Sequence, residues 1–287
     1  MRDAAIDMIK GACMLYIVGY WHLFNYTTAF PEYTNPGTTR LTVSILGLFT
    51  LVSGYLMGKK EMALTKRNVM AFYRSRLLRI YPPFFMAMLL FLAMGAMSTS
   101  TFIKGATLVG MFNGPPPPTL WFITMIMCFY AAAPVLISLR AQFLQYSVTV
   151  GTVLIFLWAG LMLTHGVDAR IFMYFPAFAL GVFLGRTPFQ RTSANMAFVA
   201  MLLIGSCLLS VSDSGPVEQS ILSMPLATLG ALSLFLIGTS PRLAARIPRA
   251  FERLSYASFS CIYSIDQFFQ SCVESTSRYR HHCKWPI

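Results

Sequence analysis

Long apolar stretches recur along almost the whole chain. They lie near residues 5–25, 41–58, 80–98, 119–138, 146–163, 170–185, 195–211 and 219–238, with a weaker one near 255–270. A helix needs about 20 mostly apolar residues to cross the hydrocarbon core of a bilayer. The pattern therefore predicts an all-α, polytopic transmembrane helical bundle of about 8–9 spans. The apolar segment 105–113 is too short to cross and is expected at the membrane interface.

The composition excludes an ordinary soluble domain. Hydrophobic residues make up 56% of the 287 residues, and charged residues make up only 11%. Soluble domains typically contain about 45–50% apolar and roughly 25% charged residues. So few charges cannot cover the surface of a globular protein of this length, and the composition favours the polytopic membrane class.

The charges are strongly unbalanced and unevenly placed. The chain has 22 Lys and Arg against 10 Asp and Glu, which gives a formal net charge of +12. In a soluble protein this balance would suggest nucleic-acid binding. When the N-terminus is placed in the cytoplasm, however, 16 of the 22 basic residues fall on the cytoplasmic side, in agreement with the positive-inside rule. We therefore expect a cytoplasmic N-terminus and no nucleic-acid partner.

The first apolar stretch holds two ionisable residues of interest besides Asp7. His22 lies in its outer half, and ionisable groups at membrane depth usually line a cavity or pathway. The alternative is a histidine that meets the outer interface beside Trp21. Lys10 lies about 18 Å nearer the cytoplasm along a helix, where it either contributes to a site or pairs with Asp7. The stretch has no small-x-small cleavage site, so it is expected to remain as a signal anchor.

Two arginines precede the third apolar stretch in the sequence FYRSRLLRIYPPFF, residues 72–85. Arg76 and Arg79 are three residues apart and therefore share one face of a helix. Two guanidinium groups on one face suit a phosphate group, while the alternative is a purely topogenic role. Pro82 and Pro83 are expected in the first turn of the following span, where a missing N–H costs little.

Other motifs point to packing rather than chemistry. The pairs Gly54/Gly58 and Gly181/Gly185 have the small-xxx-small spacing of helix–helix contacts in membranes. Ser53 lies outside any GxSxG sequence and is not predicted to be a nucleophile. The scattered cysteines show no C-x-x-C spacing, and no metal site is predicted.

Five segments follow one another in a recognisable order: IDMIKGACMLYIVGYWH, LFTLVSGYLMGKK, FYRSRLLRIYPPFF, LWFITMIMCFYAAAP and MYFPAFALGVFLGR. Together they resemble the integral-membrane acyltransferase family 3, which includes bacterial polysaccharide and lipopolysaccharide O-acetyltransferases. The resemblance covers roughly residues 5–270. Its most specific parts are the Arg-x-x-Arg-Ile-Tyr-Pro-Pro sequence and the histidine of the first span.

The resemblance implies an enzyme of the bacterial cytoplasmic (inner) membrane. It would transfer an acyl group, by default acetyl, from cytoplasmic acyl-CoA to a hydroxyl of a cell-surface or exported glycan or lipid-linked saccharide. Acetyl-CoA would be a co-substrate, with no permanently bound cofactor. His22 matches the essential catalytic histidine, and Arg76 and Arg79 match the paired arginines. Lys10 corresponds to a basic position of the family, with a spacing to His22 about one residue longer, and completes the expected CoA-binding set. Tyr81, Trp121 and Tyr130 occupy aromatic positions without an assigned role.

The predicted placement of these residues is compatible with acyl transfer. CoA would dock at the cytoplasmic face, and its pantetheine arm would carry the thioester into the bundle. His22 would deprotonate the acceptor hydroxyl, which suits an imidazole near neutral pH. An acyl-histidine intermediate is the less favoured variant.

The C-terminus departs from the family pattern. Residues 254–269 resemble the penultimate element, with Asp266 near the position of its histidine, and residues 271–287 are polar and basic. We expect an acyltransferase domain over residues 1–270, a disordered or aberrant tail over 271–287, and no last family helix. Two alternatives therefore stay open: a polytopic transporter or flippase, and a truncated inactive member of the family.

Overall fold

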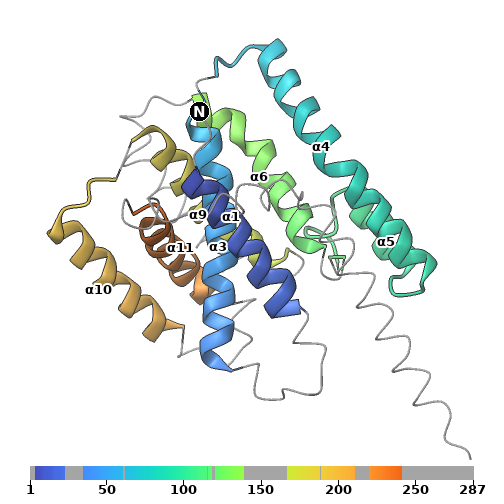
Figure 1. Ribbon diagram of the computed structural model, residues 1–287. Helices are drawn as coiled ribbons and strands as arrows, with labels where there is room; N and C mark the ends of the chain where they lie inside the picture. Colours follow the sequence, from blue (N-terminus) through green and yellow to red (C-terminus); the bar gives the residue numbers. More distant parts are fainter. Residues whose placement is uncertain are drawn as a thin grey trace, which may run out of the picture.

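All regular elements of the described chain are helices. The computed structural model describes residues 4–22, 35–60, 62–114, 116–117, 120–138, 167–187, 189–210 and 220–240, and no strand occurs among them. In chain order the elements are α1 (Ala4–Met14), the π-helix η1 (Leu15–His22), α3 (Pro36–Gly58), α4 (Lys66–Ala93), α5 (Thr99–Ala106), α6 (Trp121–Ser138), α9 (Ala169–Arg186), α10 (Ser193–Leu209), the 3-10 helix η4 (Ile221–Ser223) and α11 (Met224–Gly238) (Figure 1). The predicted all-α fold is confirmed.

Five helical segments are long and apolar enough to cross a membrane. They are Pro36–Gly58, Lys66–Ala93, Trp121–Ser138, Ala169–Arg186 and Ile221–Gly238, and α10 is a shorter apolar helix. The protein is therefore a multi-pass membrane protein. The stretches predicted near 146–163 and 255–270, and the tail at 271–287, lie outside the described residues.

Helix α4 begins much earlier than expected. The predicted span started near residue 80, but the helix starts at Lys66, where the Thr65 side chain accepts a hydrogen bond from the Asn68 N–H. Pro82 and Pro83 consequently lie inside the helix, and their placement in its first turn was wrong. The physical reason is that the Arg- and Leu-rich sequence before them has high helix propensity, and membrane helices tolerate internal proline. At 28 residues α4 is about 42 Å long, which exceeds a hydrocarbon core of about 30 Å.

Glycines bring α3 against α9 with their backbones in direct contact. A Cβ added to Gly54 or Gly58 would come within 3.0 Å of the α9 backbone, at Phe178 or Val182. On the facing helix, a Cβ added to Gly181 or Gly185 would come equally close to the α3 backbone. Only residues without a side chain permit this approach, so the predicted packing role of both glycine pairs is confirmed.

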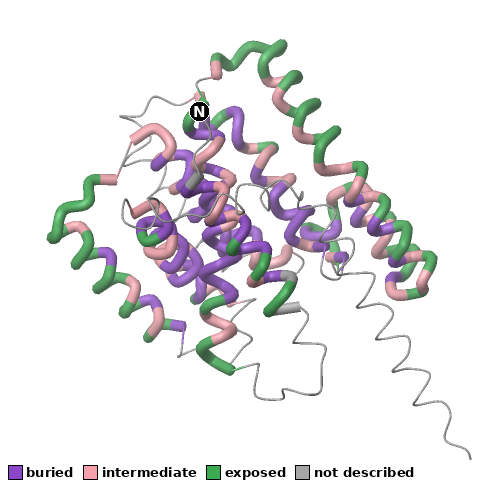
Figure 2. Tube along the Cα trace, in the orientation of Figure 1, coloured by how far each residue is buried: buried purple, intermediate pink, exposed green. Residues whose placement is uncertain are grey.

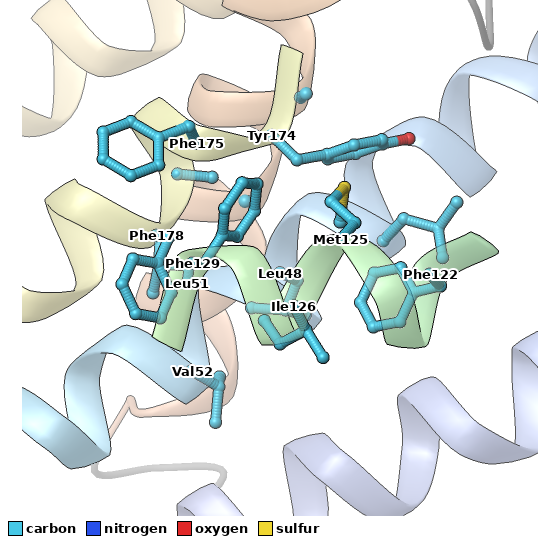
Figure 3. Packing of buried hydrophobic residues seen from close by; sticks show 14 of the residues in the cluster. Leu48, Leu51, Val52, Phe122, Met125, Ile126, Phe129, Tyr174, Phe175 and Phe178 are labelled. Carbon is cyan, nitrogen blue, oxygen red and sulfur yellow. The ribbon is translucent and has the colours of Figure 1, made fainter. Parts of the chain in front are cut away.

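The buried centre of the molecule combines α3, α6, α9 and α11, whereas α4 and α10 lie at its edges and expose most of their residues (Figure 2). Aromatic side chains fill the contact between α6 and α9 (Figure 3). The ring of Phe129 lies 5.4 Å from that of Phe175 and 5.6 Å from that of Phe178. This aromatic packing sets the height of α6 relative to α9.

Candidate functional site

Arg76 lies about three turns into α4 and faces α6. Its guanidinium carbon is 5.6 Å from the ring centroid of Phe72, one turn earlier, and 5.7 Å from that of Tyr130 on α6. The residue is half-buried, and its Nε atom is buried with no hydrogen-bond acceptor among the described residues. A buried charged donor without an acceptor is costly, so the arrangement suits a ligand that supplies one.

Tyr130 connects three helices at this point. Its phenol lies close to the Ser53 side chain of α3 and near the guanidinium groups of Arg76 and Arg79. Nearby, the Tyr73 hydroxyl donates a hydrogen bond of 2.8 Å to the carbonyl of Ala131, which holds α4 against α6. We refer to Ser53, Arg76, Arg79 and Tyr130 as the arginine–tyrosine cluster.

The cluster has an unbalanced positive charge. Within the described ranges the acidic residues are Asp7 on α1 and Asp168 before α9. Asp168 is bound to Arg170, and no carboxylate of the described chain forms an ion pair with Arg76 or Arg79. Two guanidinium groups and a phenol can together donate several hydrogen bonds to a phosphate group, which carries both the charge and the acceptors.

The predicted catalytic histidine lies toward the other end of the bundle. His22 is the last residue of η1, and its side chain lies outside the described part of the structure. Earlier in η1, the Tyr16 hydroxyl lies 3.2 Å from the Thr42 hydroxyl and donates to the Thr38 carbonyl at 3.4 Å. About 16 Å of helix α3 separates Thr42 from Ser53. The backbone of His22 and the arginine–tyrosine cluster are therefore at different depths, as the sequence predicted.

Lys10 lies in a different part of the bundle from the two arginines. It is half-buried on α1, which packs on α3 and α11, whereas α4 packs on α5 and α6. The preceding residue, Ile9, contacts the end of α11, because a Cβ on Gly238 would lie 2.7 Å from the Ile9 side chain. Of the three predicted CoA-binding residues, the structure therefore brings together Arg76 and Arg79 but does not add Lys10 to them.

Two members of the cluster were not recognised as site residues from the sequence. Ser53 was set aside because it lacks a nucleophile motif, and Tyr130 was named without a role. The clue available was the adjacent Gly54, whose close packing on α9 fixes the position of Ser53. The side-chain hydroxyl of Ser53 also donates to the Phe49 carbonyl at 2.9 Å, which suits a structural role.

A second polar group lies at the opposite end of α6 and α9. The Arg170 guanidinium lies 4.0 Å from the ring centroid of Trp121, and its Nε donates to Asp168 at 2.8 Å. Asp168 also caps α9 by accepting from the Arg170 N–H, and its own N–H donates to the Met111 carbonyl at 2.8 Å. Trp121 stacks on Tyr174 with ring centroids 6.2 Å apart. Since the charges of Asp168 and Arg170 satisfy each other, this group serves to join helix ends.

The fold and the cationic cluster define a multi-pass helical membrane protein with a site suited to an anionic ligand. The chain matches the family described as "Acyltransferase domain" over residues 3–281. It belongs to this family, which confirms the resemblance found in the sequence, and it is a membrane acyltransferase. No curated protein and no solved structure matches the chain.

Proposed function

We propose that the protein transfers an acyl group, by default acetyl, from cytoplasmic acyl-CoA to a hydroxyl of a cell-surface or exported glycan, and that it works in the bacterial inner membrane. The observation that carries the proposal is the buried Nε of Arg76, which has no acceptor among the described residues, beside an Arg79 that forms no ion pair there. A phosphate group of CoA would supply both the acceptors and the negative charge.

The depth of the cluster supports a donor that enters from the cytoplasm. Tyr130 lies about 12 Å from the end of α6 at Ser138, and the neighbouring ends of α3 and α9 meet there through Gly58 and Gly185. This is the end that the charge distribution predicts to be cytoplasmic. Lys10, near the end of α11, is proposed as a separate contact for another phosphate of the donor.

His22 is proposed as the general base. Its neutral imidazole would take the proton of the acceptor hydroxyl while that oxygen attacks the thioester carbonyl. The new C–O bond forms as the C–S bond breaks, and the CoA thiolate leaves with the electron pair of that bond. The proton on the imidazolium then passes to the thiolate, which yields the ester, free CoA and neutral His22. An imidazole suits this exchange because its ordinary pKa is close to neutrality.

The experiment uses membranes that contain the full chain, labelled acetyl-CoA and the glycan acceptor. We expect label in the glycan with the wild type, none with His22→Ala, and a raised KM for acetyl-CoA with Arg76→Gln. Arg74→Gln is the matched control, because Arg74 is exposed on the same helix and outside the cluster. An unchanged KM for Arg76→Gln would disprove the donor site. Movement of the saccharide across the membrane without labelling would indicate the transporter alternative, and neither movement nor labelling would indicate an inactive protein.

A further inference from the structure

Two consecutive prolines interrupt the hydrogen bonding of α4 directly after the arginines of the cluster. In an α-helix the carbonyl of residue i accepts a hydrogen bond from the N–H of residue i+4, and in a 3-10 turn from that of residue i+3. For Arg79 these positions are Pro83 and Pro82, and proline has no N–H. The helix therefore provides the Arg79 carbonyl with neither of its usual donors.

The preceding carbonyl is in a different position. Leu78 loses the N–H of Pro82 but can still accept from that of Tyr81 in a 3-10 turn. Leu78 and Pro82 are both exposed, whereas Pro83 is half-buried. Of the two carbonyls that the prolines affect, that of Arg79 therefore has fewer donors within the helix, and it is the one that precedes the more buried proline.

No side chain of the described chain donates to the Arg79 carbonyl. The two tyrosine hydroxyl groups of α4 are bonded elsewhere, because Tyr73 donates to the Ala131 carbonyl at 2.8 Å and Tyr81 donates to the Ala106 carbonyl at 2.9 Å. Where proline frees a carbonyl in a membrane helix, neighbouring groups or ordered water normally bond it again, since a carbonyl without a donor is costly there. A bound ligand with an N–H group would serve the same purpose.

The Arg79 carbonyl lies where an arm that extends from a bound phosphate would pass. It is three residues, about 4.5 Å, beyond Arg76 along α4, and the Arg76 guanidinium lies 5.7 Å from the Tyr130 ring centroid. The carbonyl groups of an α-helix point toward its C-terminus. Helix α4 runs away from the end that the charge distribution predicts to be cytoplasmic (Figure 1). The carbonyl therefore points from the arginines into the membrane, the direction in which the thioester arm of the donor would extend.

We propose that the Arg79 carbonyl binds an amide N–H of the pantetheine arm of the donor, so that α4 holds phosphate with its guanidinium groups and the arm with its backbone. The arm of CoA contains two amide groups, each with one N–H. The inference rests on the proposed function, and it adds a means of selecting a phosphate ester with an amide-containing arm over other phosphate compounds. Pro82 and Pro83 are positioning residues, because they act by leaving this carbonyl free.

The first test compares Pro83→Ala with Pro82→Ala in the purified full chain in mixed micelles. Each protein is titrated in a calorimeter with CoA and with adenosine 3′,5′-bisphosphate, which has phosphate groups but lacks the arm. An alanine at position 83 supplies an N–H that occupies the Arg79 carbonyl, whereas an alanine at position 82 supplies one to the exposed Leu78. Both substitutions replace a residue of very low helix propensity and should leave the melting temperature unchanged or higher.

We expect Pro83→Ala to weaken the binding of CoA about fivefold, the equivalent of one hydrogen bond, and to leave the binding of the bisphosphate unchanged. Pro82→Ala should leave the binding of both ligands unchanged. Unchanged CoA binding in Pro83→Ala, an equal loss for both ligands, or an equal loss of CoA binding in Pro82→Ala would overturn the inference.

A second measurement identifies the N–H group itself. Two CoA analogues, in which an ester oxygen replaces one or the other amide N–H, are titrated into the wild type and into Pro83→Ala. For one analogue the loss of affinity should be about fivefold in the wild type and absent in Pro83→Ala, because both changes remove the same hydrogen bond. Equal losses in the two proteins for both analogues would refute the inference.

These binding measurements do not depend on acyl transfer. If the wild type bound CoA as expected but transferred no acyl group, the proposed function would fail and the inference about the carbonyl would stand. If the wild type transferred an acyl group but Pro83→Ala bound CoA equally well, the inference would fail and the proposed function would stand. A wild type that did not bind CoA would reject the donor site and the inference together.

Discussion

The ion pair between Asp168 and Arg170 allows a quantitative test of the structure. The two side chains are 12% and 13% exposed, and Arg170 also stacks on Trp121. Arg170→Met removes the guanidinium, keeps most of the side-chain volume, and leaves the Asp168 carboxylate without its charged partner. Removal of one partner from a buried pair costs about 3–5 kcal/mol. Because Asp168 keeps some exposure and its capping bond, we expect the lower end of this range, about 3 kcal/mol of unfolding free energy.

The assay is unfolding of the purified protein in mixed micelles with increasing SDS, followed by Trp fluorescence. The double variant Asp168→Asn/Arg170→Met contains no unpaired charge, so its loss should be smaller than the sum of the single losses by about 1–3 kcal/mol. Arg40→Met is the control. It removes hydrogen bonds of 2.9 Å to the Ser210 hydroxyl and 2.8 Å to the Pro36 carbonyl, but it leaves no carboxylate without a partner, and it should cost about 1.5 kcal/mol. Additive losses in the double variant, or equal losses for Arg170→Met and Arg40→Met, would refute the reasoning.

Three further predictions concern the cluster and the helix contacts. Tyr130→Phe removes the phenol hydroxyl from the cluster and should raise the KM for acetyl-CoA about tenfold. The control Tyr73→Phe loses only a hydrogen bond to the Ala131 carbonyl and should leave this KM unchanged. The KM for acetyl-CoA should rise with salt concentration in the wild type, because salt screens the attraction between the arginines and phosphate. The rise should be less steep in Arg79→Gln. Equal salt dependence in both proteins would contradict a role of Arg79 in binding phosphate. Gly181→Ala should lower the unfolding free energy by about 1–3 kcal/mol through overpacking against α3, and a neutral effect in the SDS assay would contradict the close contact.

Much of the architecture followed from the sequence because a bilayer imposes a simple length rule. Apolar stretches of sufficient length predicted α3, α6, α9 and α11, and the glycine spacing predicted packing sites at Gly54/Gly58 and Gly181/Gly185. These features depend on local composition and on a fixed repeat along one helix, so they can be read without knowledge of neighbouring elements. The start of α4 was missed because the helix begins at a polar Thr65 cap, outside the apolar pattern.

The arginine–tyrosine cluster could be predicted only in part from the sequence. The sequence determined that Arg76 and Arg79 share a helix face near one end of a span, since three residues make most of a helical turn. Only the tertiary structure placed Ser53 and Tyr130 beside them and Lys10 on a separate packing surface. The reason is that contacts between helices depend on the height and rotation of one helix relative to another. Close packing such as that of Gly54 on α9 sets both, and neither produces a periodic pattern in the sequence.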